Sequence, residues 1–175
     1  MTTTRYILLS IAISIIGIGV FFYYKMGGFN APELSIINAP SYTIVGKPYT
    51  GRMNSKEFGK LFEEADSLIK SGTIKGVSCA WFENNPESGK DTVKAFVGVA
   101  TTTSPSALPK GFEVKTTSSR KVVQAHILAH YMLAPQTYSK LKDFADSKNI
   151  KVNDAPTLEL YNSENDVIIQ QPVKE

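Results

Sequence analysis

The hydrophobic pattern begins with one uninterrupted apolar run. Residues 6–24 carry no charge and lie between Arg5 and Lys25. A helix of about 20 residues, rising about 1.5 Å per residue, spans the roughly 30 Å hydrocarbon layer of a bilayer. The run is longer than the apolar core of a typical signal peptide, and no small-residue cleavage signal follows it. We therefore expect residues 1–25 to form an uncleaved, single-pass membrane anchor.

Tyrosines stand at both ends of this run, as is typical of side chains at a membrane–water interface. Tyr6 lies at one end, and Tyr23 and Tyr24 lie at the other. The two flanks differ by one positive charge, which favours an internal amino terminus but leaves the orientation uncertain. Residues 26–40 contain two glycines and two prolines, and we expect a linker or an extended lead-in there.

Beyond residue 40 the pattern alternates between the two-residue period of strands and the helical period. Strand-like segments cover residues 41–49, 77–82 and 95–101, and a short extended piece covers 112–117. Between the first two strands, Ser55 follows Asn54 as a capping residue. A helical stripe then follows, made of Phe58, Leu61, Phe62, Ala65, Leu68 and Ile69.

The second half repeats this order. Residues 121–131 alternate as a long strand, and Pro135 opens a helix at a favourable first-turn position. The apolar stripe of this helix contains Tyr138, Leu141, Phe144 and Ala145. Two further strands are predicted over residues 157–161 and 167–170.

This order predicts an α+β domain over residues 41–173, built from two β-α-β-β units with pseudo-twofold symmetry. The short sequence Ala-Asp-Ser recurs at 65–67 and 145–147, late in the two helices. We expect the helices to cover one side of the sheets. The cleft between the halves is then the natural ligand site.

The composition of the chain limits the kinds of partner and site that it can have. The chain has 175 residues and a net charge of +3 without a dense basic stripe, so no nucleic-acid partner is expected. Cys79 is the single cysteine, which excludes an intramolecular disulfide, and its apolar neighbours indicate a core position. His126 and His130 fall on a predicted strand, about 13 Å apart at 3.3 Å per residue, too far to share one metal ion. We predict no metal, no cofactor and no catalytic residue.

Glu159 is the main candidate for a binding residue. It stands between Leu158 and Leu160, which we expect to face the helices, so Glu159 and Tyr161 should face the cleft. A carboxylate among aromatic rings either has a raised pKa or attracts a cation. The alternative interpretation is a strand glutamate that faces solvent.

Five further aromatic residues are candidates for the lining of the cleft. The alternative for each is ordinary core packing. These residues are Trp81, Phe82, Tyr49, Phe112 and Tyr131.

Three short motifs resemble those of GyrI-like small-molecule-binding domains. Residues 81–86 read Trp-Phe-Glu-Asn-Asn-Pro, similar to that family's aromatic-aromatic-acid-Asn-Pro motif with one extra Asn. Residues 111–114 read Gly-Phe-Glu-Val, and residues 156–161 end in the Glu-x-Tyr of the family's late strand. The resemblance covers roughly residues 42–173 and implies a duplicated β-α-β-β fold, which is also related to the haem-binding SOUL proteins.

The resemblance also implies a function. Such a domain would bind an amphipathic, often cationic, small molecule, with Glu159 as the counter-charge. The layout is similar to a membrane-anchored branch that includes an ER-phagy receptor, but the long acidic tail with its autophagy motif is missing, so no autophagy role is expected. A protein-interaction domain without a ligand and a hydrolase remain alternatives, so enzymatic activity is left open. No helix-turn-helix precedes the domain.

Overall fold

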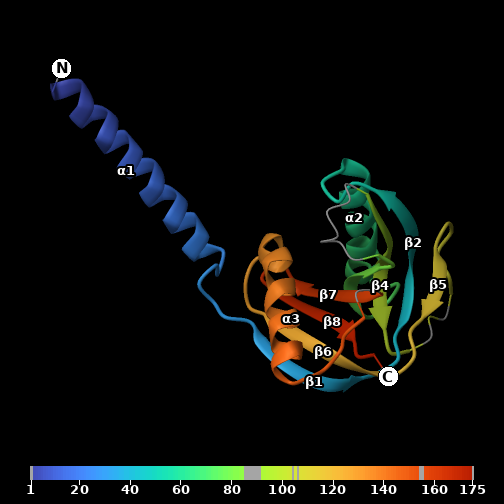
Figure 1. Cartoon of the computed structure of the whole chain (residues 1–175). Helices are drawn as coiled ribbons and strands as arrows, with labels where there is room; N and C mark the ends of the chain where they lie inside the picture. The colour runs from blue at the N-terminus through green and yellow to red at the C-terminus, as the bar shows by residue number, and fades with distance from the viewer. Residues whose placement is uncertain (1, 85–91, 104, 106, 154–155, 175) are drawn as a thin grey trace.

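A computed structural model describes residues 2–84, 92–103, 105, 107–153 and 156–174 of the chain. The amino-terminal helix α1 (Thr2–Lys25) stands apart from a domain of strands and helices (Figure 1). Its segment Arg5–Lys25 is long and apolar enough to cross a membrane, and none of it is buried against the domain. A signal sequence near an amino terminus can also meet these criteria of length and hydropathy.

The domain is organised around one antiparallel sheet with the order β1-β6-β8-β7-β3-β4-β2-β5. Its strands are β1 (Glu33–Ala39), β2 (Thr43–Gly51), β3 (Val77–Phe82), β4 (Val93–Thr101), β5 (Glu113–Thr116), β6 (Arg120–Ile127), β7 (Thr157–Ser163) and β8 (Asp166–Pro172). The first half contributes β3-β4-β2 and the second contributes β7-β8-β6, in mirrored order. The halves meet where β3 pairs with β7. The predicted α+β fold with two related halves is confirmed.

Each half places its helix on the same face of the sheet. Helix α2 (Lys56–Lys70) packs on β2, β3 and β4, and α3 (Thr137–Ser147) packs on β6 (Figure 1). Ser55 accepts a hydrogen bond from the backbone N–H of Phe58, which confirms the predicted cap of α2. Leu141 and Ala145 anchor α3 in its half of the core, as Phe58 and Ala65 anchor α2.

The opposite face of the sheet has its own apolar cluster. Its buried members are Ile44, Cys79, Phe96, Ala100, Leu158 and Leu160. The prediction that the two leucines face the helices is therefore wrong, because the helices cover the face that carries Glu159 and Tyr161 instead. The strands β2 and β4 also approach closely where Gly46 pairs with Gly98. A Cβ atom on Gly98 would lie 2.0 Å from the carbonyl oxygen of Val45, so only glycine fits there.

Several boundaries differ from those that the pattern predicts. The segment 26–40 contains β1, whose Leu34 and Ile36 pack on the core beneath α3, so the sheet begins before residue 41. Strand β6 ends at Ile127, and a 3₁₀ helix η1 (Tyr131–Gln136) contains Pro135 before α3 begins. The Asn85 and Pro86 positions of the 81–86 motif lie outside the described residues.

Candidate functional site

Strand β7 positions Glu159 at the junction between the two halves. Glu159 is paired with Ala80 of β3 on one side and with Ile169 of β8 on the other. Alternation along the strand turns Leu158 and Leu160 to one face and Glu159 to the helix face. There the Glu159 side chain is 4% exposed, so this carboxyl does not face open solvent.

Two tyrosine hydroxyls hold the Glu159 carboxyl. Tyr138 of α3 donates to Oε1, and Tyr161 of β7 donates to Oε2. Burial raises the pKa of Glu159 above its ordinary value, and the two hydrogen bonds partly offset this rise. Burial also raises the pKa of Tyr161 well above its ordinary value. The negative charge of Glu159 and the hydrogen bond to it raise this pKa further. The site is therefore one acidic group that accepts hydrogen bonds from two neutral hydroxyls, and no Lys or Arg of the described residues forms an ion pair with it.

Aromatic rings form the wall between this carboxyl and the first half. Phe62 of α2 meets the Tyr161 ring edge to face, with centroids 5.3 Å apart. This contact joins the helix of one half to the strand of the other. Phe58 and Phe82 lie behind it in the same apolar cluster, and their ring centroids are 6.4 Å apart.

Two buried hydroxyls lie on the same face as Glu159. Ser78 is paired with Tyr161, and Thr157 is paired with Phe82. Among the described residues, Ser78 Oγ and Thr157 Oγ1 are buried side-chain oxygens without a hydrogen-bond partner. A buried hydroxyl without a partner costs free energy. The face of the sheet beside Glu159 therefore carries polar groups as well as aromatic rings.

The structure brings some of the predicted site residues together. Tyr161 touches Glu159, Phe82 packs beside Tyr161, and Tyr49 stacks on Phe58 in the same cluster at 4.9 Å between ring centroids. Tyr131 lies at the start of η1, is 46% exposed, and raises the pKa of Tyr161 slightly.

Two predicted residues lie elsewhere. Trp81 points to the opposite face, where it is paired with Leu158, and the Lys115 ammonium lies 5.3 Å from its ring. Phe112 packs on a separate cluster around Val45, with Lys47 4.7 Å from its ring centroid. Trp81 lies away from Glu159 because side chains alternate between the two faces along β3. Phe112 lies away from it because it precedes β5, at the edge of the sheet.

Tyr138 and Phe62 also belong to the candidate site, although the apolar pattern predicted only that they lie on the buried stripes of the two helices. A tyrosine in a core stripe is itself a signal, because its buried hydroxyl needs a partner. The partner of Tyr138 is Glu159, 21 residues later in the chain. Phe62 carries no comparable signal, since a phenylalanine at a stripe position is typical of core packing.

The two histidines make separate contacts. His126 Nε2 lies 2.9 Å from Asp166 Oδ1, whereas the His130 ring accepts from the backbone N–H of Met132 and caps η1. Within the described part of the chain, no group of three or more His, Cys, Asp or Glu side chains is placed to hold a metal ion. Cys79 is fully buried, and this burial raises its pKa to about 12.

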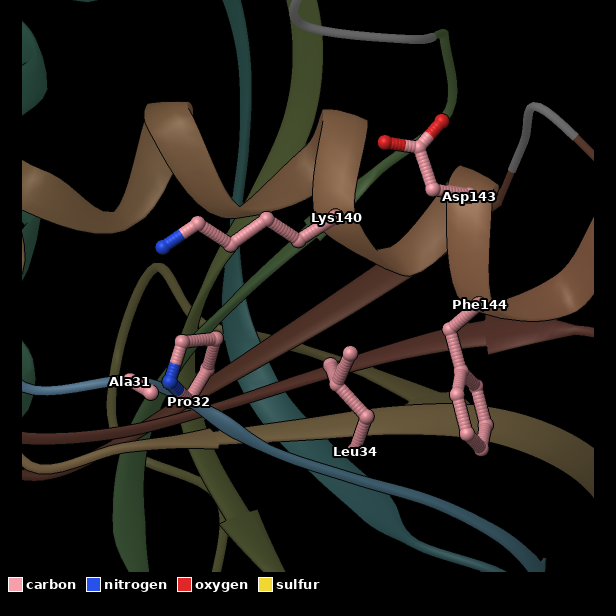
Figure 2. A pocket seen from close by; sticks show the side chains of 6 residues that line it. All are labelled: Ala31, Pro32, Leu34, Lys140, Asp143 and Phe144. Atoms are coloured by element: carbon pink, nitrogen blue, oxygen red, sulfur yellow. The ribbon is translucent and has the colours of Figure 1, made fainter. Parts of the chain in front are cut away.

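A shallow pocket of about 460 Å³ lies on the outer side of α3, away from Glu159. Leu34 of β1 and Phe144 of α3 form its apolar part, while Lys140 and Asp143 stand on the helix above them (Figure 2). The pair of opposite charges at its rim gives it no net preference for an ion. Its place beside Ala31 and Pro32 puts it next to the connection from α1.

Several solved structures share the fold of this chain. SAV2435, solved bound to tetraphenylphosphonium, has a TM-score of 0.59 and 16% identity, covering 81% of this chain and 94% of that chain. A hydrolase from Listeria innocua has a TM-score of 0.56 and 12% identity, covering 87% and 98%. EcmrR in a DNA complex has a TM-score of 0.61 and 10% identity, covering 98% and 68%.

These identities show a shared fold and nothing more. No match to a curated protein was found. The model of the GyrI-like small molecule binding domain, in contrast, matches residues 32–171, which is most of the chain and includes β1. By this match the chain belongs to the family of GyrI-like small-molecule-binding domains.

Proposed function

We propose that this protein binds amphipathic organic cations at Glu159 and that α1 anchors it in a membrane. The buried Glu159 carboxyl, held only by the hydroxyls of Tyr138 and Tyr161, is the observation that supports a cationic ligand. A cation beside it would favour the charged carboxylate, which burial disfavours. The rings of Phe62 and Tyr161 supply faces for the apolar part of such a ligand.

Binding at Glu159 requires movement, because both carboxyl oxygens already accept hydrogen bonds and little of the side chain is exposed. The Phe62–Tyr161 contact is the one that we expect to open, since it joins a helix side chain of one half to a strand side chain of the other beside Glu159. The ligand-bound neighbour SAV2435 supports a cation of this class, as its bound tetraphenylphosphonium is an apolar cation. The buried, unpartnered Ser78 and Thr157 hydroxyls could add hydrogen bonds to a ligand with a polar group.

The test is titration of the full chain in lipid nanodiscs with tetraphenylphosphonium, comparing Glu159→Gln with the parent. We expect the substitution to weaken binding roughly tenfold or more, which corresponds to about 1.4 kcal/mol. Glu164→Gln, on the exposed turn after β7, is the matched control and should bind like the parent. Equal binding by the parent and Glu159→Gln would contradict the proposal. No binding at all would favour a protein-interaction domain.

A second candidate is hydrolysis, which the structural similarity to the Listeria innocua hydrolase supports. Glu159 with its raised pKa and the adjacent Tyr161 could exchange a proton with a substrate. Mass spectrometry of reactive electrophiles incubated with the protein distinguishes the two functions. Hydrolysis that Glu159→Gln abolishes would support an enzyme, whereas intact compounds throughout would leave only binding.

A further inference from the structure

The connection between α1 and the domain is short and hydrogen-bonded rather than free. Gly27 follows the helix with φ +75°, a left-handed conformation that ends helices. The backbone N–H of His130 then donates to the Met26 carbonyl at 2.9 Å. Asn30 Nδ2 donates to the Leu128 carbonyl at 2.6 Å. The loop before η1 is therefore held against the end of α1, where Figure 1 shows α1 beside the upper end of α3.

The surface at this junction is apolar. Beyond α1, seven large apolar side chains of the described residues are exposed: Phe29, Met53, Leu108, Val114, Leu128, Tyr131 and Met132. Four of them lie at this junction. We call Phe29, Leu128, Tyr131 and Met132 the juxtamembrane patch; Phe29 is 65% exposed and Met132 is 63% exposed.

The patch continues the aromatic end of α1 into the domain. The Phe29 ring meets the Tyr23 ring edge to face, with centroids 5.1 Å apart, and lies 6.5 Å from the Tyr24 ring. Aromatic side chains at this depth are typical of membrane–water interfaces. The segments 26–32 and 128–139 contain no Asp, Glu, Lys or Arg, although charged residues make up 20% of the chain.

We propose that the juxtamembrane patch rests in the headgroup region of the bilayer that α1 spans, so that the domain is docked on the membrane. This inference rests on the anchoring in the proposed function. The occupant is the lipid surface because the patch begins at the carboxyl-terminal end of α1, where the helix would leave the bilayer, and hydrogen bonds hold it there. Apolar side chains on segments free of Asp, Glu, Lys and Arg, such as 26–32 and 128–139, enter the interface by several ångströms.

Single-cysteine labelling of the full chain tests this docking. Cys79 is fully buried, with its pKa raised to about 12, so an engineered surface cysteine should react selectively. Leu128→Cys and Met132→Cys would carry a polarity-sensitive fluorophore within the patch. Leu108→Cys is the matched control: Leu108 is 50% exposed against 52% for Leu128, and it precedes β5, at the opposite edge of the sheet from β1.

In phosphatidylcholine vesicles, the probes at 128 and 132 should emit at shorter wavelength than the probe at 108. Lipids spin-labelled at the headgroup should quench them about twofold or more, as expected for a side chain in the interface. Emission and quenching equal to those at 108, with the protein still floating with the vesicles, would overturn docking alone. A shielded probe that lipid labels do not quench would indicate a protein partner or a second copy and also overturn it. Failure to float would overturn the anchoring, and this inference with it.

Discussion

The two halves of the domain share one plan and differ in chemistry where they meet. Their helices correspond at a separation of 80 residues, since 138 − 58 and 145 − 65 give the same value for Phe58 with Tyr138 and Ala65 with Ala145. At the centre of the sheet Ala80 is paired with Glu159, so the approximate twofold relation exchanges these two residues. The same relation places Phe82 in the position of Tyr161.

The first half thus has Phe, Ala and Phe where the second has Tyr, Glu and Tyr. In the first half the two rings pack together, with centroids 6.4 Å apart. In the second half both rings carry hydroxyls that donate to the added carboxyl. One fold unit therefore forms an apolar wall, while its copy holds a buried acid together with the two hydroxyls that donate to it.

The largest effect is expected from placing a second acid in the first half, directly opposite Glu159. Ala80 is fully buried beside Phe58 and Phe82 and is paired with Glu159, so Ala80→Glu buries a second carboxyl next to the first. We expect a loss of about 3–5 kcal/mol in the free energy of unfolding at neutral pH. Urea denaturation of the full chain in detergent, followed by Trp81 fluorescence, measures this loss.

Ala80→Gln is the control for volume and polarity. Because protonation removes the buried charge, the difference in free energy of unfolding between Ala80→Glu and Ala80→Gln should decrease as the pH falls. A difference that stays constant with pH would mean that size, not charge, distinguishes the two halves at this position.

The next effect comes from removing one donor from the second half. Tyr138 is buried, and its hydroxyl donates to Glu159. Tyr138→Phe makes this position like Phe58, and we expect it to cost about 1.5–3 kcal/mol, the range for hydrogen bonds to charged groups. A thermal denaturation series that also contains Glu159→Gln and the double variant measures the coupling. Additive losses would show that the hydroxyl and the carboxyl do not depend on each other.

The helix starts provide a smaller contrast. Ser55 caps α2 with a 3.0 Å hydrogen bond to the N–H of Phe58, whereas Gln136 makes no side-chain capping bond to α3. Ser55→Ala should therefore cost about 1 kcal/mol and Gln136→Ala close to nothing. Chemical denaturation of both variants checks this, and equal losses would contradict the assigned caps. Ser55 also lies 2.7 Å from the Tyr49 hydroxyl, so the orientation of that ring should change too.

The mildest substitution is Glu159→Gln, which keeps the shape of a protonated carboxyl. The pKa of Glu159 is raised above its ordinary 4.5 by burial, so the folded state binds more protons than the unfolded state above that pH. The contribution of Glu159 to stability is therefore fully present in acid and decreases as the pH rises from about 4.5 through the folded pKa. Unfolding measured between pH 4 and 8 should show this decline for the parent and less of it for Glu159→Gln. Parallel curves would contradict it.

Local sequence was sufficient for much of the fold. The period of apolar residues predicted α2, the strand 77–82 and the duplicated order, because each element must bury one face. The resemblance identified the family, and Glu159 with Tyr161 proved to be in direct contact. Strand ends were less accurate: β6 stops at Ile127 because the chain turns into η1, a change that alternation does not reveal.

The face of each strand was the main thing that sequence could not determine. Leu158 and Leu160 alternate with Glu159 in either orientation, and both faces of this sheet carry apolar clusters. Only the tertiary structure decides which face the helices cover, since that depends on how both halves pack. For the same reason Trp81 lies on the other face from the predicted cleft. Tyr138 and Phe62 lie beside Glu159 and Tyr161, although they belong to helices distant in the chain.

The amino-acid sequence alone predicted the apolar span of α1, the repeated order of elements and the position of Glu159 in a strand. These follow from composition and period, which are local properties. The tertiary structure decided that two tyrosines hold this acid, that aromatic rings close the junction between the halves, and that the exposed apolar residues gather beside α1. Those outcomes depend on contacts between distant segments, and the energy of such contacts exists only in the folded chain.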